Sequence, residues 1–138
     1  YNVRWGDPEA EILLPLIEDD LYPAFLAAAT GHMEEVEDFT YKPGFSVGVV
    51  LAAEGYPEKP IPGAVIEGLD NVDDQRVQVI HAGTKKRDYG SYEVNGGRVL
   101  VVQGYDPQSL ENARSRTYTQ AERIYFEGMQ YRRDIAQV

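Results

Sequence analysis

The spacing of hydrophobic and polar residues changes near residue 39, and this change divides the chain into two predicted regions. Before it, apolar residues recur at the three- and four-residue steps typical of a helix. After it, short runs rich in β-branched residues are separated by glycine and proline, which is the pattern of strands. We therefore predict two units, 1–38 and 39–138, with helices in the first and a sheet in the second.

The first unit is predicted to hold a strand followed by two helices. The alternating aromatic and β-branched residues of YNVRW favour a strand at the very start, so we expect the sequence to be a piece of a longer protein. Asp7 is suited to cap a helix over 8–18, which Pro15 should kink or shorten. A second helix is expected from residue 19 onward, ending at Thr30-Gly31.

The second unit is predicted to be a mainly antiparallel, barrel-like sheet with one long packing helix, so the fold class is α+β. The predicted helix covers 107–124, and 83–90 is expected to be a basic loop. Asn95-Gly96-Gly97 predicts a tight hairpin between the runs that flank it. Strands are expected at 45–53, 65–66, 77–81, 91–94 and 98–102.

Composition and charge narrow the class of protein. The chain has 138 residues, 43% of them hydrophobic, and no cysteine, which excludes disulfides and thiolate chemistry. Residues 1–74 hold 16 acidic and 3 basic side chains, against 7 and 10 in 75–138. The acidic half argues against nucleic-acid binding, and no apolar run is long enough for a membrane span. We expect a cytoplasmic protein without a nucleic-acid or membrane partner.

Few residues stand out as candidates for chemistry. Asn2 and Arg4 share one face of the predicted strand, where an amide oxygen can ligate Mg²⁺ and a guanidinium can bind phosphate or carboxylate. A solvated polar face is the plainer alternative. His81 ends an apolar strand and is either structural or a contact for an anion.

Several motifs, in order along the chain, resemble those of phosphoribosylamine–glycine ligase, also called glycinamide ribonucleotide synthetase. The resemblance spans essentially the whole chain, although Trp5 replaces a usual Phe and Ala136 an expected Gly. The motifs are YNVRWGDPE (1–9), VVLAA with GYP (49–57), HAGT (81–84), NGGRVL (95–100) and FEGMQYRRDI (126–135).

This resemblance implies an ATP-grasp ligase of purine biosynthesis. Such an enzyme uses ATP to phosphorylate the carboxylate of glycine, and the nitrogen of 5-phospho-β-D-ribosylamine then attacks the glycyl phosphate. The products are glycinamide ribonucleotide, ADP and phosphate. Mg²⁺ or Mn²⁺ neutralises the phosphate oxygens during transfer.

The same resemblance implies roles for individual residues. Asn2 matches a metal ligand whose partner, a glutamate, would stand one position before Tyr1. Arg4 matches an arginine that faces the substrate phosphate or carboxylate and is the expected catalytic residue. Asp7 either caps the helix or contacts substrate, and His81 and Arg98 are further candidates for substrate binding.

The resemblance also implies that the family's N-terminal domain and most of its ATP-grasp domain are missing from this sequence. We therefore expect the 138-residue chain to be inactive by itself. The alternative is a noncatalytic binding or scaffold domain that keeps this fold. Apolar residues of the first unit should be exposed by the missing parts and favour self-association.

Overall fold

Two long strands rich in β-branched residues form the centre of the protein. The protein is described here by a computed structural model over residues 3–137. β1 (Phe45–Ala52) and β6 (Arg98–Asp106) pair antiparallel, and β3 (Val77–His81) pairs with the other edge of β6. A second, smaller antiparallel sheet has the order β2 (Val65–Ile66), β5 (Tyr92–Val94), β4 (Thr84–Lys86). The predicted α+β class and antiparallel pairing are confirmed, and the two sheets remain open rather than closing into a barrel.

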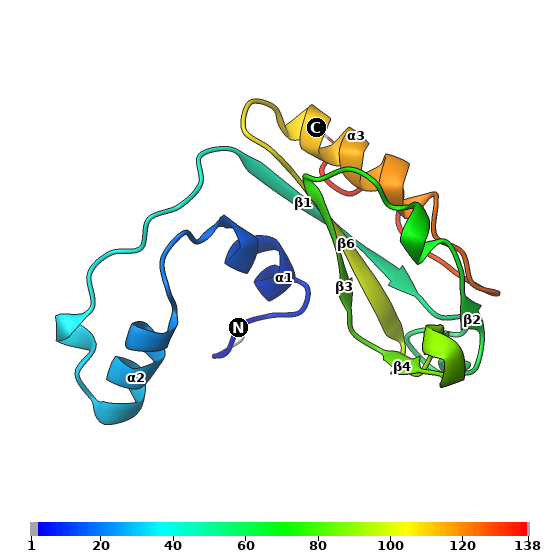
Figure 1. Cartoon of the computed structure of the whole chain (residues 1–138), viewed down its shortest axis with the longest axis horizontal. Helices are drawn as coiled ribbons and strands as arrows, with labels where there is room; N and C mark the ends of the chain where they lie inside the picture. The colour runs from blue at the N-terminus through cyan, green and yellow to red at the C-terminus, as the bar shows by residue number, and fades with distance from the viewer. Residues whose placement is uncertain (1–2, 138) are drawn as a thin grey trace.

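The helix α3 (Leu110–Ala121) covers one face of the larger sheet (Figure 1). It begins later than predicted because the Asp106 carboxylate accepts hydrogen bonds from the backbone of Gln108 and Ser109, which turns the chain before the helix starts. Ser109 then caps the helix by accepting from the Asn112 amide. The side chains buried between sheet, helix and C-terminal segment include Val49, Leu51, Val94, Leu100, Val102, Ala121, Ile124 and Phe126.

Two glycines allow close packing on opposite faces of the larger sheet. A Cβ at Gly104 would lie 2.3 Å from Thr117 Oγ1 of α3. A Cβ at Gly48 would lie 2.8 Å from Ile12 Cγ1. Gly48 pairs with Gln103, the residue before Gly104, so side chains at these two positions point to opposite faces.

The first unit consists of short helices. α1 (Glu9–Leu13) runs into a 3₁₀ turn, η1 (Leu14–Leu16), because Pro15 breaks the helix as expected. α1 lies against β1, whereas α2 (Tyr22–Thr30) stands away from the sheet (Figure 1). Gly31 ends α2 in the left-handed conformation, as predicted, and a second 3₁₀ turn, η2 (Met33–Glu35), follows.

Two expectations for the start of the chain are wrong. Residues 3–7 form no strand, and the part of that prediction at 1–2 lies outside the described residues. Asp7 does not cap α1: the cap position is Pro8, and the Asp7 carboxylate pairs with Arg98 instead. A long-range ion pair has therefore replaced the local hydrogen bond that the sequence favoured.

The prediction of a hairpin at Asn95-Gly96-Gly97 is also wrong. β5 pairs with β2 and β4, while β6 pairs with β1 and β3, so the strands on either side of Asn95 belong to different sheets. The Asn95 amide instead donates to the Gly83 carbonyl. The expected basic loop contains β4 and a further 3₁₀ turn, η4 (Asp88–Gly90).

The remaining connections include a 3₁₀ turn, η3 (Leu69–Asn71), between β2 and β3. Within residues 3–137, no helix is long and apolar enough to cross a membrane. The division of the chain at residue 38 stays a prediction.

Candidate functional site

Arg98, the first residue of β6, joins three segments that are distant in the sequence. Its Nε donates to the Tyr56 hydroxyl at 2.8 Å, and its Nη1 lies 3.1 Å from Asp7 Oδ1 and also donates to the Asp7 carbonyl. The hydrogen bond to Tyr56 and then the bond to Asp7 raise the pKa of Arg98 above its usual value, so the guanidinium is charged. We call Asp7, Tyr56 and Arg98 the Arg98 cluster.

Glycines place Tyr56 and Arg98 in contact. A Cβ at Gly97 would lie 2.4 Å from Cδ2 of the Tyr56 ring, so only glycine leaves space for the ring beside the start of β6. Gly83 approaches the same strand from the other side, where its amide donates to the Arg98 carbonyl at 2.8 Å. A Cβ at Gly83 would lie 2.6 Å from that carbonyl oxygen.

The segment after α3 holds the backbone beside the Arg98 cluster in place. The Gln130 side-chain amide donates to the carbonyls of Ala53 and Tyr56, at 2.8 and 3.1 Å. Ala52 and Gln130 also pair through both backbone amides, at 2.8 and 3.0 Å. The chain direction at Tyr56 is thereby fixed by hydrogen bonds from a segment 74 residues later.

A cleft of about 550 Å³ opens beside the cluster. Arg132 on its wall is bound to Asp134 through two hydrogen bonds of 2.9 and 2.6 Å, which lower the pKa of Asp134 and raise that of Arg132. The cleft is lined by Pro8, Gly48, Val49, Val50, Ala52, Tyr56, Arg98, Gln130, Tyr131, Arg132 and Ile135. Most of the lining is therefore apolar, and Tyr56, Arg98 and Arg132 add a hydroxyl and two charged groups to it.

The structure brings together only some of the predicted site residues. Asp7 and Arg98 are in contact, whereas Asn2 lies outside the described residues. Arg4 is exposed, and its Nη1 donates to the adjacent Trp5 carbonyl at 2.6 Å. His81 does not line the cleft: its Nδ1 lies 3.0 Å from Thr84 Oγ1 and its ring packs on Tyr92. The functional roles expected of these residues stay predictions.

Tyr56 and Gln130 were not predicted as site residues, although both lie in motifs that the sequence singles out. Gly55 and Gly128 in these motifs were the available signal, because a glycine within a motif indicates that another part of the chain approaches its backbone. Arg98 belongs to one of the five motifs, and three others contact it through Asp7, Tyr56 and Gly83. The fifth motif contacts the Tyr56 carbonyl through Gln130.

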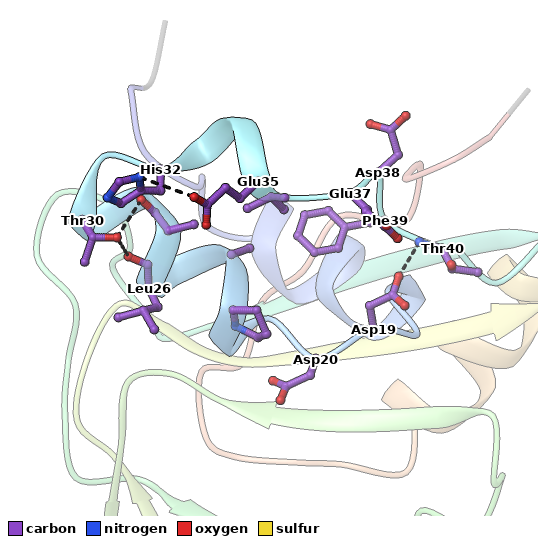
Figure 2. A pocket seen from close by; sticks show the side chains of 14 residues that line it. Asp19, Asp20, Leu26, Thr30, His32, Glu35, Glu37, Asp38, Phe39 and Thr40 are labelled. Atoms are coloured by element: carbon purple, nitrogen blue, oxygen red, sulfur yellow. Dashed lines mark hydrogen bonds and ion pairs between the residues drawn. The ribbon is translucent and has the colours of Figure 1, made fainter.

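A second hollow, of about 480 Å³, lies between α2 and the linker that follows it (Figure 2). Its carboxylates include Asp19, which accepts from the Thr40 amide at 2.5 Å, and Glu35, which pairs with His32. His32, Glu34 and Glu35 are the described trio whose possible ligand atoms lie within 4.8 Å of one another, and all three side chains are exposed. The Asp19–Thr40 bond joins the segment before α2 to the end of the linker, and the contacts of His32 lie within the linker.

Comparison with known proteins agrees with this arrangement. The family model "Phosphoribosylglycinamide synthetase, C domain" matches residues 46–138. A phosphoribosylamine–glycine ligase of Neisseria meningitidis is 43% identical over 136 residues, covering 99% of this chain and 31% of that protein. The trifunctional purine biosynthetic protein adenosine-3 of Chironomus tentans is 38% identical over 137 residues, covering 98% of this chain and 10% of that protein.

A solved structure gives the same result. The crystal structure of phosphoribosylamine–glycine ligase from Thermotoga maritima superposes with a TM-score of 0.72 at 38% identity, covering 97% of this chain and 32% of that one. The chain thus spans about a third of the length of the single-function ligases that it matches. Since the family model covers most of the chain and its motifs meet at Arg98, the chain belongs to the phosphoribosylglycinamide synthetase family and contains that family's C domain.

Proposed function

We propose that this chain is the C-terminal part of a phosphoribosylamine–glycine ligase that joins glycine to 5-phospho-β-D-ribosylamine and releases ADP and phosphate. The observation that carries the proposal is the meeting of five separated motifs at the Arg98 cluster. A cleft whose lining includes a guanidinium and a hydroxyl from two separate motifs favours a ligand-binding wall over a scaffold alone.

In this proposal the cleft beside Arg98 forms one wall of the substrate site. Arg98 lines this wall, and its guanidinium is held there by Asp7 and Tyr56. Arg4 contributes a second guanidinium from the segment that precedes Asp7, and the proposal assigns it the catalytic role. His81 is less suited to substrate contact, because its ring is held by Thr84 and Tyr92 outside the cleft.

ATP and a divalent cation, Mg²⁺ or Mn²⁺, belong to the proposal for the whole enzyme. The described residues do not offer a site that fits the cation: His32, Glu34 and Glu35 are exposed and lie beside α2 rather than at the cleft. The proposed ligand Asn2 lies outside the described residues. We therefore derive no step through the metal from this chain, and we place the metal and nucleotide sites mainly in the upstream two thirds of the enzyme.

The test is ADP release that depends on both glycine and phosphoribosylamine. Two samples are compared, the 138-residue chain and the full-length product of its gene, each shown to be folded by circular dichroism. We expect substrate-dependent ADP only from the full-length protein. In that protein, Arg4→Met should lower turnover, whereas Arg87→Met should leave it unchanged, since Arg87 pairs with Glu93 in the smaller sheet.

Each other outcome contradicts a stated part of the proposal. Turnover by the 138-residue chain alone would show that the upstream regions are not needed. Two folded but inactive samples would favour the scaffold alternative, with Arg4 an ordinary surface residue.

A further inference from the structure

The chain segment that carries Arg4 is held to the sheet at two places. At the far end of α1, Ile12 packs on Gly48, and the Ile12 carbonyl accepts from Ser46 Oγ at 2.9 Å. At the near end, the contact is polar and comes from Arg98, which binds both the carboxylate and the carbonyl of Asp7. Because two separate points fix the direction of a short rod, these contacts together determine how residues 3–6 leave α1.

Arg98 is itself rigidly held. Its backbone carbonyl accepts from Gly83, and its Nε is bound to a tyrosine whose ring is pressed against Gly97. Its guanidinium donates to Asp7 through Nη1 and to Tyr56 through Nε, a geometry that lysine cannot reproduce with a single ammonium group. The side chain is 37% exposed and that of Asp7 is 48% exposed, so solvent can compete when the geometry is lost.

We propose that Arg98 is a positioning residue, which clamps Asp7 onto the sheet and so fixes the direction of the segment that carries Arg4. This inference rests on the proposed function only for its catalytic consequence, because the clamp itself is a property of the 138-residue chain. It differs from substrate binding by Arg98: the partner of the guanidinium is the protein's own Asp7, and Asp7 and Arg98 act as one unit.

Trp5 gives a direct readout of the clamp. It is the single tryptophan of the chain, lies two residues before Asp7, and is 48% exposed. In the 138-residue chain, Asp7→Asn and Arg98→Met should each lower the fluorescence anisotropy of Trp5 and raise its quenching by acrylamide. The effect of Arg98→Met should be the larger, because that substitution also removes the bond to the Asp7 carbonyl. The double variant should show no change beyond that of Arg98→Met, which already removes both bonds to Asp7. Arg87→Met is the matched control and should leave both signals unchanged.

The catalytic consequence is tested in the full-length protein. Asp7→Asn and Arg98→Met should each lower kcat by about 10- to 100-fold, because a misplacement of about 1 Å costs up to this much, while the KM values for glycine and phosphoribosylamine remain similar. Tyr56→Phe, which leaves Asp7 in place, should have a smaller effect of the same kind.

The outcomes separate this proposal from its alternatives. An unchanged Trp5 signal in both variants would overturn the clamp, whatever the activity of the full-length protein. A large rise in KM for Arg98→Met together with normal kinetics for Asp7→Asn would assign Arg98 to substrate binding instead. A full-length protein without activity would refute the proposed function, while the Trp5 measurements would still decide whether the clamp exists.

Discussion

Replacement of Gly104 by alanine tests how closely α3 packs on the larger sheet. The new Cβ would lie 2.3 Å from Thr117 Oγ1, 3.0 Å from the Ala113 carbonyl oxygen and 3.1 Å from the Thr117 amide nitrogen. Favourable contacts of a carbon atom begin at about 3.5 Å, so α3 must move away from β6 by about 1 Å. Thr117 is fully buried and its hydroxyl is bonded within the helix to Ala113 at 2.8 Å, so its side chain has no free direction in which to turn.

Overpacking of a core lowers the free energy of unfolding by about 1–3 kcal/mol. We expect Gly104→Ala to lower it by about 2–3 kcal/mol, at the upper end of this range, because backbone atoms must move. The measurement is urea unfolding followed by circular dichroism, with the midpoint and slope fitted for each variant. Gly48→Ala is the matched control on the opposite face. Its new Cβ would meet Ile12 side-chain atoms and, farther away, a Val101 methyl group. Because Ile12 can change rotamer, we expect the free energy of unfolding to change by no more than about 1 kcal/mol.

A double variant isolates the steric cause. Thr117→Ala removes the hydroxyl that the new Cβ would strike, so Gly104→Ala should cost at least about 1 kcal/mol less in the Thr117→Ala background than in the native one. The packing argument is refuted if Gly104→Ala is no more destabilising than Gly48→Ala, or if the effects at Gly104 and Thr117 simply add.

Two further predictions concern charge and exposed surface. The backbone amide of Gln108 and further hydrogen bonds lower the pKa of Asp106 from its usual 3.8, so the stability that this carboxylate contributes is present above about pH 4 and is lost as the pH falls through its folded pKa. Urea midpoints measured from about pH 6 to pH 3 should therefore fall, and by less in Asp106→Asn; equal slopes in both proteins would contradict this. Tyr22 and Phe25 of α2 are 67% and 58% exposed, so the 138-residue chain should self-associate at high concentration, and Phe25→Ser should reduce this in sedimentation velocity. A chain that stays monomeric at all concentrations would contradict self-association through α2.

Local patterns sufficed to predict most of the elements of the second unit. The apolar runs of β1, β3 and β6 are each long enough to form a buried strand whichever strand pairs with them. The residues of α3 form a helix, as their spacing predicts. Pairing was harder to predict, because Asn95-Gly96-Gly97 carries the composition of a hairpin turn and instead serves a close approach: a Cβ at Gly96 would lie 3.0 Å from Gly83 Cα. Composition cannot distinguish a glycine needed for its dihedral angles from one needed for its small size.

The candidate site was predictable only in part, for the same reason. Arg98 and Asp7 were both singled out from motifs, yet the bond between them spans 91 residues, and no local spacing reveals it. Asp7 before a proline favours a helix cap in isolation, and the guanidinium of Arg98 outcompetes that role because a charge-assisted pair is stronger than a capping bond at an exposed helix end. Tyr56 acquires its role only through the ring space left by Gly97.

The pairing of β1 with β6 also sets the order in which this protein can fold during its synthesis. Phe45 at the start of β1 pairs with Asp106 at the end of β6, and β3 reaches β1 only through β6. A nascent chain therefore carries β1 and β3 without a partner until β6 has left the ribosome, and closing so long a loop is slow. The unpaired edges and apolar faces of β1 and β3 are exposed throughout that interval, so aggregation is a greater hazard for the ribosome-bound intermediate than for the finished domain.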